Sequence, residues 1–152
     1  MQKENWPVPR IGEVYYMCFD GSGSEQRGWR PGLIFQNNLG NLYSPNVIAL
    51  PMTSSLKKLH QPTIDDLAHQ PTHVLISAND TGLRYDSVVL CENPQRMSKE
   101  LVGNFITALP ISYMRKIAEA SLIALSAISF LDAEALMRAW KRAVALNSGL
   151  KV

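Results

Sequence analysis

The stretch GSGSEQRGWRPGLIFQNN (residues 21–38) and the later stretch IALPMTSS (residues 48–55) decide the fold. Each contains an apolar run short enough to be a buried strand, with a polar or cationic side chain at its edge. Arg30 stands just before the run that begins at Pro31, and Thr53 stands just after the apolar residues 47–50. If the two strands are neighbours, Arg30 and Thr53 share one rim of a small sheet or barrel, and we place the function there.

Short runs rich in β-branched and aromatic residues continue this pattern through the first two-thirds of the chain. One expected strand begins at Pro31 and ends at the polar segment 36–38. The other expected strands cover residues 13–19, 47–52, 72–76 and 86–91, with a last short strand at 105–109. Residues 20–28 form a glycine-rich polar loop that lets the backbone approach a ligand. A tight turn is expected at 40–45. The segment 54–70 is expected to be a surface insertion with one helical turn near 64–67.

From Ser112 onward the apolar residues recur at spacings of three and four, which predicts an amphipathic helix with Ser112 as its N-cap. Asp132 is expected to cap a second helix over 133–146, whose basic residues are interpreted as a solvated face. Its apolar stripe comprises Leu136, Met137, Trp140 and Val144. The expected fold is therefore mainly β with C-terminal helices, built on a small SH3-like barrel rather than a parallel α/β sheet.

Composition limits the classes of protein and partner. With 152 residues, 46% of them hydrophobic, the chain suits a single domain over 1–152. A net charge of +2 argues against general polyanion binding, so any nucleic-acid site must be local. Cys18 and Cys91 each lie in an apolar run, which predicts two buried reduced thiols. The N-terminus lacks a signal-peptide core and no apolar run suits a membrane helix, so we expect a soluble, cytoplasmic protein.

Several kinds of site have no signature in this sequence. There is no CxxC pair, no HExxH, no GxxxxGK[ST] and no GxGxxG, and no cluster of carboxylates. His60, His69 and His73 do not have the spacing of metal ligands on a helix, and a structural or solvated role is the simpler interpretation. We therefore expect no metal and no cofactor.

The remaining candidates are an arginine, two hydroxyls and two aromatic rings. Arg30, on a strand after a glycine-rich loop, offers a fixed fork of donors for a phosphate, and a structural salt bridge is the alternative. Thr53 and Ser54 offer hydroxyl donors at a strand end, or serve ordinary turn and capping roles. Trp29 and Tyr43 are suited to stack on bases, or belong to the core.

These residues belong to an ordered series of short motifs. In chain order they are Gly12-Glu13-Val14-Tyr15, Gly23-Ser24-Glu25-Gln26 with Gly28 and Arg30-Pro31, Gln36-Asn37, Ser44-Pro45, Pro51-Met52-Thr53-Ser54, Pro71-Thr72-His73-Val74, Asp86-Ser87-Val88 and Leu90-Cys91-Glu92, followed by the helix at 111–130. In this order and combination the sequence resembles the MazF/PemK family of type II toxin–antitoxin toxins, whose SH3-like barrel is shared with the CcdB toxins. The resemblance covers about residues 11–131, which leaves 132–152 as a helical extension.

The resemblance implies a sequence-specific endoribonuclease that cuts single-stranded RNA, chiefly mRNA, without a metal. It implies Arg30 and Thr53 as the catalytic pair, and products with 2′,3′-cyclic phosphate and 5′-hydroxyl ends. This is chemically consistent, because RNA carries its own nucleophile, the 2′-hydroxyl, which the protein need only align and deprotonate. It also implies a homodimer and a cognate MazE-like antitoxin whose acidic flexible segment fills the RNA groove, with DNA binding in that complex.

The same resemblance assigns a set of RNA-binding positions. These are Ser24, Glu25, Gln26, Asn37, Ser54, Gln95 and Arg96. The general base stays unassigned, because an arginine remains protonated in proteins, and Glu25 is a candidate by its position in the loop.

The chain also departs from the family pattern in three places. Arg96 is displaced by one position, which on a strand sends it to the opposite face, and Gln95 is the candidate to replace it. The stretch 56–70 is longer than the usual connection, and the tail from Asp132 lies beyond the usual end. The presence of both Arg30 and Thr53 favours the nuclease, whereas the altered segment 93–96 keeps an alternative open: a non-catalytic RNA-binding regulator, or a gyrase-directed CcdB-like toxin on the same fold.

Overall fold

The computed structural model describes residues 8–21, 27–54 and 71–148. Its strands are β1 (Glu13–Asp20), β2 (Arg27–Ile34), β3 (Asn46–Thr53), β4 (His73–Ile76), β5 (Ser87–Leu90), β6 (Gln95–Ser98) and β7 (Val102–Ala108). Its helices are α1 (Asn38–Tyr43), α3 (Ala78–Thr81), α4 (Ile111–Leu125) and α5 (Ala133–Ser148), with short 3-10 turns η2 (Lys99–Leu101) and η3 (Ala127–Phe130). The stretch 56–70 lies outside the described residues.

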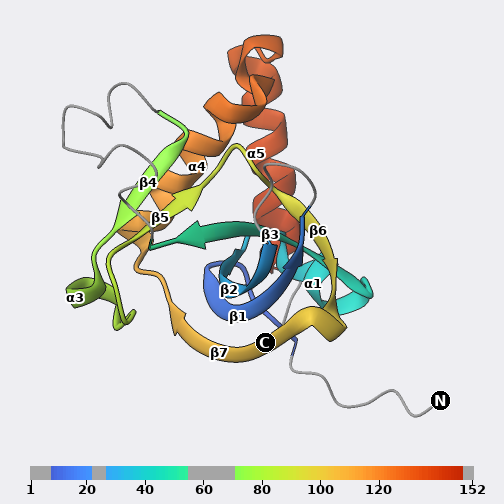
Figure 1. Cartoon of the computed structure of the whole chain (residues 1–152). Coiled ribbons are helices and arrows are strands. Elements are labelled where there is room, and N and C mark those ends of the chain that lie inside the picture. The colour runs from blue at the N-terminus through green and yellow to red at the C-terminus, as the bar shows by residue number, and fades with distance from the viewer. Residues whose placement is uncertain (1–7, 22–26, 55–70, 149–152) are drawn as a thin grey trace.

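The strands form one strongly curled antiparallel sheet (Figure 1). Its order is β4-β5-β3-β2-β1-β7, and β6 pairs with β3 beside this path. Since β6 and β7 follow each other along the chain and pair with β3 and β1 respectively, they bridge two sides of the curl without closing it by hydrogen bonds. This confirms the expected fold, which is mainly β with C-terminal helices and barrel-like.

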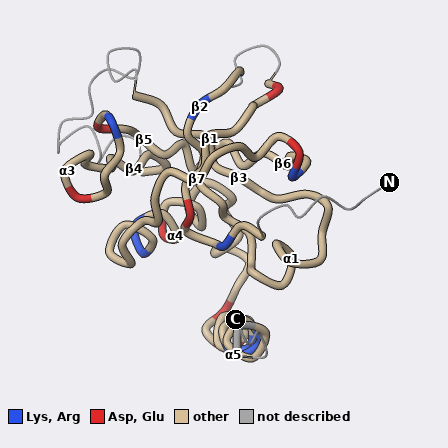
Figure 2. Tube along the Cα trace, turned by 90° about the horizontal axis from the view of Figure 1, so that it is seen from below, with Lys and Arg blue, Asp and Glu red and all other residues tan. Residues whose placement is uncertain are grey.

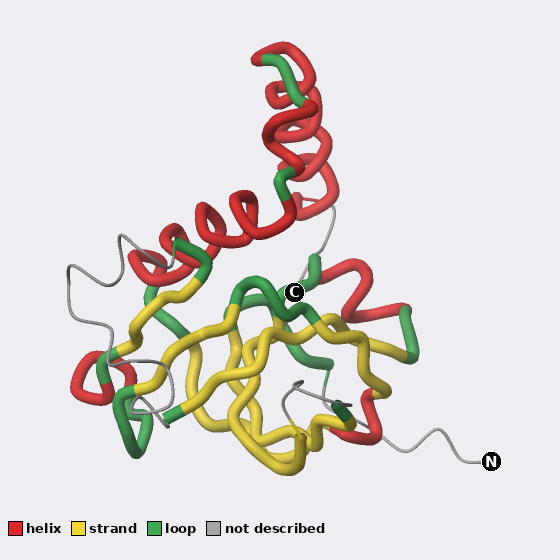
Figure 3. Tube along the Cα trace, turned by 45° about the horizontal axis from the view of Figure 1, so that its top comes forward, coloured by secondary structure: helices red, strands yellow, loops and turns green. Residues whose placement is uncertain are grey.

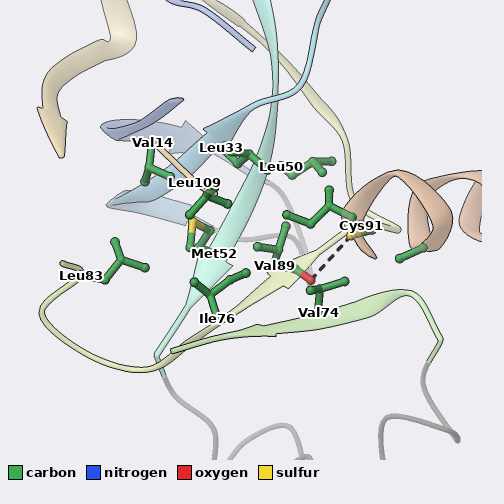
Figure 4. Close-up of a cluster of buried hydrophobic side chains, with 12 residues drawn as sticks. Val14, Leu33, Leu50, Met52, Val74, Ile76, Leu83, Val89, Cys91 and Leu109 are labelled. Atoms are coloured by element: carbon green, nitrogen blue, oxygen red, sulfur yellow. Dashed lines mark hydrogen bonds between the residues drawn. The ribbon is translucent and has the colours of Figure 1, made fainter. Parts of the chain in front are cut away.

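The central strands are buried on both faces, because side chains alternate between two apolar clusters. On β2, Leu33 and Ile34 are both fully buried and enter different clusters. The cluster shown in Figure 4 fills the space between the sheet and α4, and contains Val14, Leu33, Leu50, Met52, Val74, Ile76, Leu83, Val89, Cys91, Leu109, Ile117 and Ala120. The cluster inside the curl contains Tyr15, Met17, Phe19, Ile34, Val47, Ala49 and Met97.

The two cysteines differ in their surroundings. Both are free; Cys91 is buried as expected, whereas Cys18 is only half-buried, so that expectation is wrong for Cys18. Burial raises the pKa of the Cys91 thiol to about 12, with the nearby Ser121 hydroxyl acting against this rise and the charge of Glu92 acting in the same direction as burial. Cys91 is therefore a packing residue of the main core.

Several boundaries differ from the sequence expectations. The second strand begins at Arg27 rather than at Pro31, because its first residues pair with the end of β1, where Asp20 lies opposite Arg27. Strand β6 was not expected, and the last strand begins at Val102 rather than at 105. Pairing with strands that are distant in the sequence sets all these boundaries.

Two helix starts also differ. Helix α1 occupies a segment that we expected to be a turn, and the side chain of Asn37 caps it by accepting a hydrogen bond from the Gly40 backbone N–H at 2.9 Å. Helix α4 begins at Ile111 with Pro110 at the cap position, so Ser112 as N-cap is wrong. The expected cap of α5 is confirmed, since Asp132 Oδ1 accepts from the Ala135 backbone N–H at 2.7 Å.

The last helix carries an apolar stripe that its own chain does not cover. Leu136, Met137, Trp140 and Val144 are 43%, 52%, 61% and 46% exposed, respectively. In Figure 3 the helical segment that leaves the sheet turns back on itself, and α5 runs from its tip back towards α1, which it contacts. None of the helices within residues 8–21, 27–54 and 71–148 has the length and hydropathy of a membrane span.

A substitution at Gly103 can test the close pairing of β1 with β7. A Cβ at this position would lie 2.6 Å from the carbonyl oxygen of Tyr16, which is backbone and cannot move aside. We expect Gly103→Ala to lower the free energy of unfolding by about 1 to 3 kcal/mol, as an overpacking change. Urea denaturation measures this loss, with Asn104→Ala at the exposed neighbouring position as the control. Equal stability of the two variants would contradict this packing.

Candidate active site

The pairing of β2 with β3 brings Arg30 and Thr53 together. The register places Gly32 opposite Pro51 and Leu33 opposite Leu50. Arg30 lies two residues before Gly32 and Thr53 two residues after Pro51, so both stand just beyond the paired residues at the same end of this strand pair. Both side chains are half-buried, and the expectation that their strands are neighbours is confirmed.

An open groove of about 460 Å³ lies over this point of the sheet. It is lined by Tyr16, Trp29, Arg30, Pro31, Met52, Thr53, Ser54, Leu83, Arg84, Tyr85, Ser87 and Ile106. The lining therefore combines apolar side chains with two arginines and five hydroxyl-bearing residues, at the rim named from the sequence. A groove of this composition suits a ligand with both flat apolar surfaces and negative charge.

Arg30 is held in place from two directions. Its backbone pairs with Met17 on β1, whose side chain is fully buried. Its guanidinium Nη2 donates a hydrogen bond to the Arg27 carbonyl oxygen at 2.6 Å. A guanidinium fixed in this way on a strand presents a rigid fork of donors, the geometry that matches a phosphate group.

One wall of the groove is aromatic. Tyr16 on β1 and Trp29 on β2 are stacked, with ring centroids 5.7 Å apart and planes 24° apart. Trp29 is 53% exposed, so it is not a core aromatic. Tyr43, the other ring considered from the sequence, lies on α1 and does not line the groove.

The facing wall comes from the segment between α3 and β5. Arg84 and Tyr85 are exposed there, and the Arg84 guanidinium carbon lies 5.2 Å from the centre of the Tyr85 ring. They stand between two buried side chains, Leu83 in the main core and Ser87 at the start of β5. The Ser87 hydroxyl donates to the Tyr85 carbonyl oxygen at 2.9 Å.

This segment is also anchored at its base. Gly82 ends α3 with a φ of 74°, a left-handed conformation that glycine adopts without strain. The Thr107 hydroxyl on β7 donates to the Thr81 carbonyl oxygen at 2.7 Å, and Asp86 accepts from the Ala78 backbone N–H at 2.8 Å. The wall that carries Arg84 and Tyr85 is therefore tied to the sheet.

Sequence reasoning missed Arg84, Tyr85 and Ser87 as lining residues. The available signal was an arginine and a tyrosine shortly after Gly82 and just before the strand expected at 86–91, and no role was assigned to them from the sequence. Their place in the groove depends on the contact between Thr107 and Thr81, which is not visible in local sequence.

The other positions named from the sequence fall elsewhere. Ser24, Glu25 and Gln26 lie outside the described residues. Asn37 follows the opposite end of β2 from Arg30 and caps α1. Gln95 and Arg96 pair with Ala49 and Ile48 at the first half of β3, and none of these four residues lines the groove. Of the expected RNA-binding positions, the structure brings Ser54 alone among the described ones into the groove with Arg30.

Charge is spread over the molecule rather than gathered on one face. Figure 2 shows Lys and Arg on several elements, including β2, α4 and α5, with Asp and Glu between them. Within the described ranges, no group of three or more His, Cys, Asp or Glu residues is arranged to hold a metal ion.

His73 lies outside the groove. Its Nε2 is 2.7 Å from Glu92 Oε1, and it lines a separate cavity of about 260 Å³ beside α4. Burial acts to raise the pKa of Glu92, but the hydrogen bond with His73 and smaller contributions outweigh it, so the pKa falls below its ordinary value. The pair joins the start of β4 to the end of β5, which fits the structural role expected for this histidine.

A family model matches most of the chain. It is described as PemK-like, MazF-like toxin of type II toxin–antitoxin system, and it matches residues 10–125. A curated relative, Endoribonuclease EndoA of Bacillus subtilis, is 38% identical over 124 residues, which cover 81% of this chain and 99% of the relative. The family model's match includes both Arg30 and Thr53 and ends before α5.

Solved structures agree with this match. An endoribonuclease in complex with its cognate antitoxin, from a mycobacterial species, is 28% identical with a TM-score of 0.59, covering 78% of this chain and 96% of the other. A MazF crystal structure from Deinococcus radiodurans is similar in fold, with a TM-score of 0.64 at 21% identity, covering 79% of this chain and 98% of the other.

Proposed function

The chain belongs to the PemK-like, MazF-like toxin family of type II toxin–antitoxin systems, and we propose that it is an endoribonuclease toxin whose active site is the groove at Arg30 and Thr53. The observation that carries the proposal is that the pairing of β2 with β3 brings the side chains of Arg30 and Thr53 into one groove. The endoribonuclease name of the Bacillus subtilis relative supports it.

The proposed reaction needs no metal. The 2′-hydroxyl of one nucleotide attacks the adjacent phosphorus, the bond to the 5′-oxygen breaks, and the products carry a 2′,3′-cyclic phosphate and a 5′-hydroxyl. Negative charge builds on the phosphate oxygens in the transition state, where Arg30 neutralises it and, as the acid, gives a proton to the leaving 5′-oxygen. Thr53 donates a hydrogen bond to a non-bridging oxygen. The proton from the 2′-hydroxyl goes to a base that we do not assign among the described residues, with Glu25 a candidate by position.

The proposed substrate is single-stranded RNA, chiefly mRNA, which places the reaction in the cytoplasm. An A-form duplex displays its base edges poorly to side chains, whereas unpaired bases are free to stack on exposed rings. The exposed rings of Tyr16 and Trp29 beside Arg30 fit such a strand. Further RNA contacts are proposed for Ser54 in the groove and, from the resemblance, for Ser24, Glu25 and Gln26. Asn37, Gln95 and Arg96 do not line the groove of a single chain, so the RNA contacts of these three residues stay predictions that rest on the resemblance.

Two protein partners are proposed. One is a cognate MazE-like antitoxin, whose acidic flexible segment competes with RNA for the groove; the mycobacterial endoribonuclease structure, solved with its cognate antitoxin, supports this. The other is a second copy of this chain. We further propose that 11–131 form the catalytic unit and that 132–152 extend it within the single domain, with the uncovered stripe of α5 contributing to the dimer.

The proposed dimer contact can be tested on α5. Trp140→Glu places a charge in the exposed apolar stripe, so we expect the variant to shift from dimer towards monomer. Light scattering coupled to size exclusion measures the mass in solution. Ala139→Glu introduces the same charge on the same helix off the stripe and should stay dimeric. Dimers of equal stability in both variants would remove α5 from the interface.

The catalytic assignment can be tested by cleavage. Purified protein is incubated in EDTA with a long single-stranded RNA, and the cut ends are mapped. We expect discrete cuts with cyclic phosphates, and a fall of about 100- to 1,000-fold in rate for Arg30→Ala, because a preorganised donor to the phosphate is lost. Thr53→Ala should also lose activity, and Arg115→Ala on the exposed face of α4 should retain it.

The outcomes separate the function classes. Near-normal cleavage by Arg30→Ala would contradict the assignment of the site. A well-folded wild-type protein that binds the RNA but leaves it intact would instead favour an RNA-binding regulator. If it neither binds nor cuts RNA, a protein-directed toxin becomes the better interpretation.

A further inference from the structure

Two walls that each carry an exposed aromatic ring flank Arg30 and Thr53. On one side stand Tyr16 and Trp29, and on the other Tyr85 with Arg84. We propose that Arg84 and Tyr85 form a base-recognition wall, on which Tyr85 stacks a base next to the cut and Arg84 selects a base with two adjacent acceptors, guanine or cytosine. This inference rests on the proposed function and adds the determinant of its sequence preference.

Tyr85 has the exposure and position for stacking. Its side chain is 57% exposed and lines the same groove as Trp29, which is 53% exposed. Because Trp29 and Arg30 line the same groove, a base on the Trp29 ring lies near a phosphate on the guanidinium. The base that stacks on Tyr85 is then that of the nucleotide on the other side of this phosphate. Any of the four bases can stack on an aromatic ring, so Tyr85 contributes to affinity rather than to selectivity among bases.

Arg84 provides the selectivity among bases. Its guanidinium carbon lies over one face of the Tyr85 ring, 5.2 Å from the ring centre, so a base bound beside this ring meets a fork of N–H donors. Such a fork pairs with two neighbouring acceptors, as in O6 and N7 of guanine, or O2 and N3 of an unpaired cytosine. Adenine and uracil present a donor within the corresponding edges, so they satisfy the fork poorly.

The wall is preorganised. Buried Leu83 and Ser87 hold its two ends, and the hydrogen bond from Thr107 to the Thr81 carbonyl ties its base to β7. A fixed wall loses little conformational freedom when RNA binds, which favours selectivity. The sequence of this segment therefore helps to determine which RNA sites are cut.

Binding is measured first, because it does not depend on catalysis. Fluorescent single-stranded RNAs of about ten nucleotides are used: uridine alone, alternating guanosine and uridine, and alternating cytidine and uridine. For Tyr85→Ala we expect a loss of about 5- to 100-fold in affinity for all three, as for removal of a stacking platform. Tyr43→Ala, an exposed tyrosine outside the groove, is the matched control and should bind normally.

Selectivity is measured with Arg84→Lys and Arg84→Ala. Lysine keeps the charge but lacks the fork, so we expect both variants to reduce the preference for the guanosine or cytidine probe by about 5- to 100-fold. In the mapped cleavage of long RNA, one position beside the cut should lose its preference for guanine or cytosine. Arg115→Ala serves as the control for removing an exposed arginine, and thermal melting checks that each variant is folded.

The results separate this inference from the proposed function. If the wild type cuts RNA and Arg84→Lys, Arg84→Ala and Tyr85→Ala keep the wild-type sites and affinities, the recognition wall is wrong while the nuclease stands. If the wild type binds with the expected preference but does not cut, the wall stands and the nuclease assignment falls. A wild type without preference among the three probes contradicts the role of Arg84.

Discussion

The antiparallel pairing of β2 with β3 is the constraint on which the rest of the structure depends. It spans few residues, yet it sets Leu33 against Leu50 in the core and brings Arg30 and Thr53, just beyond the paired residues, to the same groove. A slip of one residue would turn every one of these side chains to the other face of the sheet. The two apolar clusters prevent such a slip, because β2 contributes fully buried side chains to both of them. The packing of the core therefore determines the geometry of the site.

This arrangement separates chemistry from recognition. Arg30 and Thr53 stand on paired strands, whose backbone positions are shared with the core, so their spacing is rigid. Arg84 and Tyr85 stand on a connection, which is free to vary between related chains without disturbing the sheet. Helix α5 follows the region shared with the family and leaves an apolar stripe exposed. Catalytic groups, recognition groups and the added surface thus occupy parts of the fold that can change independently.

The sequence predicts the part of this structure that depends on local pattern. Apolar runs bounded by Arg30 and Thr53 identified β2, β3 and their shared rim, and the Asp132 cap identified the start of α5. Residues whose environment depends on distant partners were missed. Helix α1 forms where Asn37 caps an otherwise turn-like segment, and Asn41 is buried there, with its amide donating to the Gln36 carbonyl oxygen at 2.9 Å. The groove residues after Gly82 were missed for the same reason, since β7 positions them.

The most direct test of the central claim is a crystal structure of the protein with a short single-stranded RNA made uncleavable by 2′-O-methylation at the cut nucleotide. The account predicts one phosphate between the Arg30 guanidinium and the Thr53 hydroxyl, each within hydrogen-bond distance of its oxygens. It also predicts the flanking bases against Trp29 and Tyr85. RNA bound away from this groove, for example along the basic residues of α5, would contradict the account.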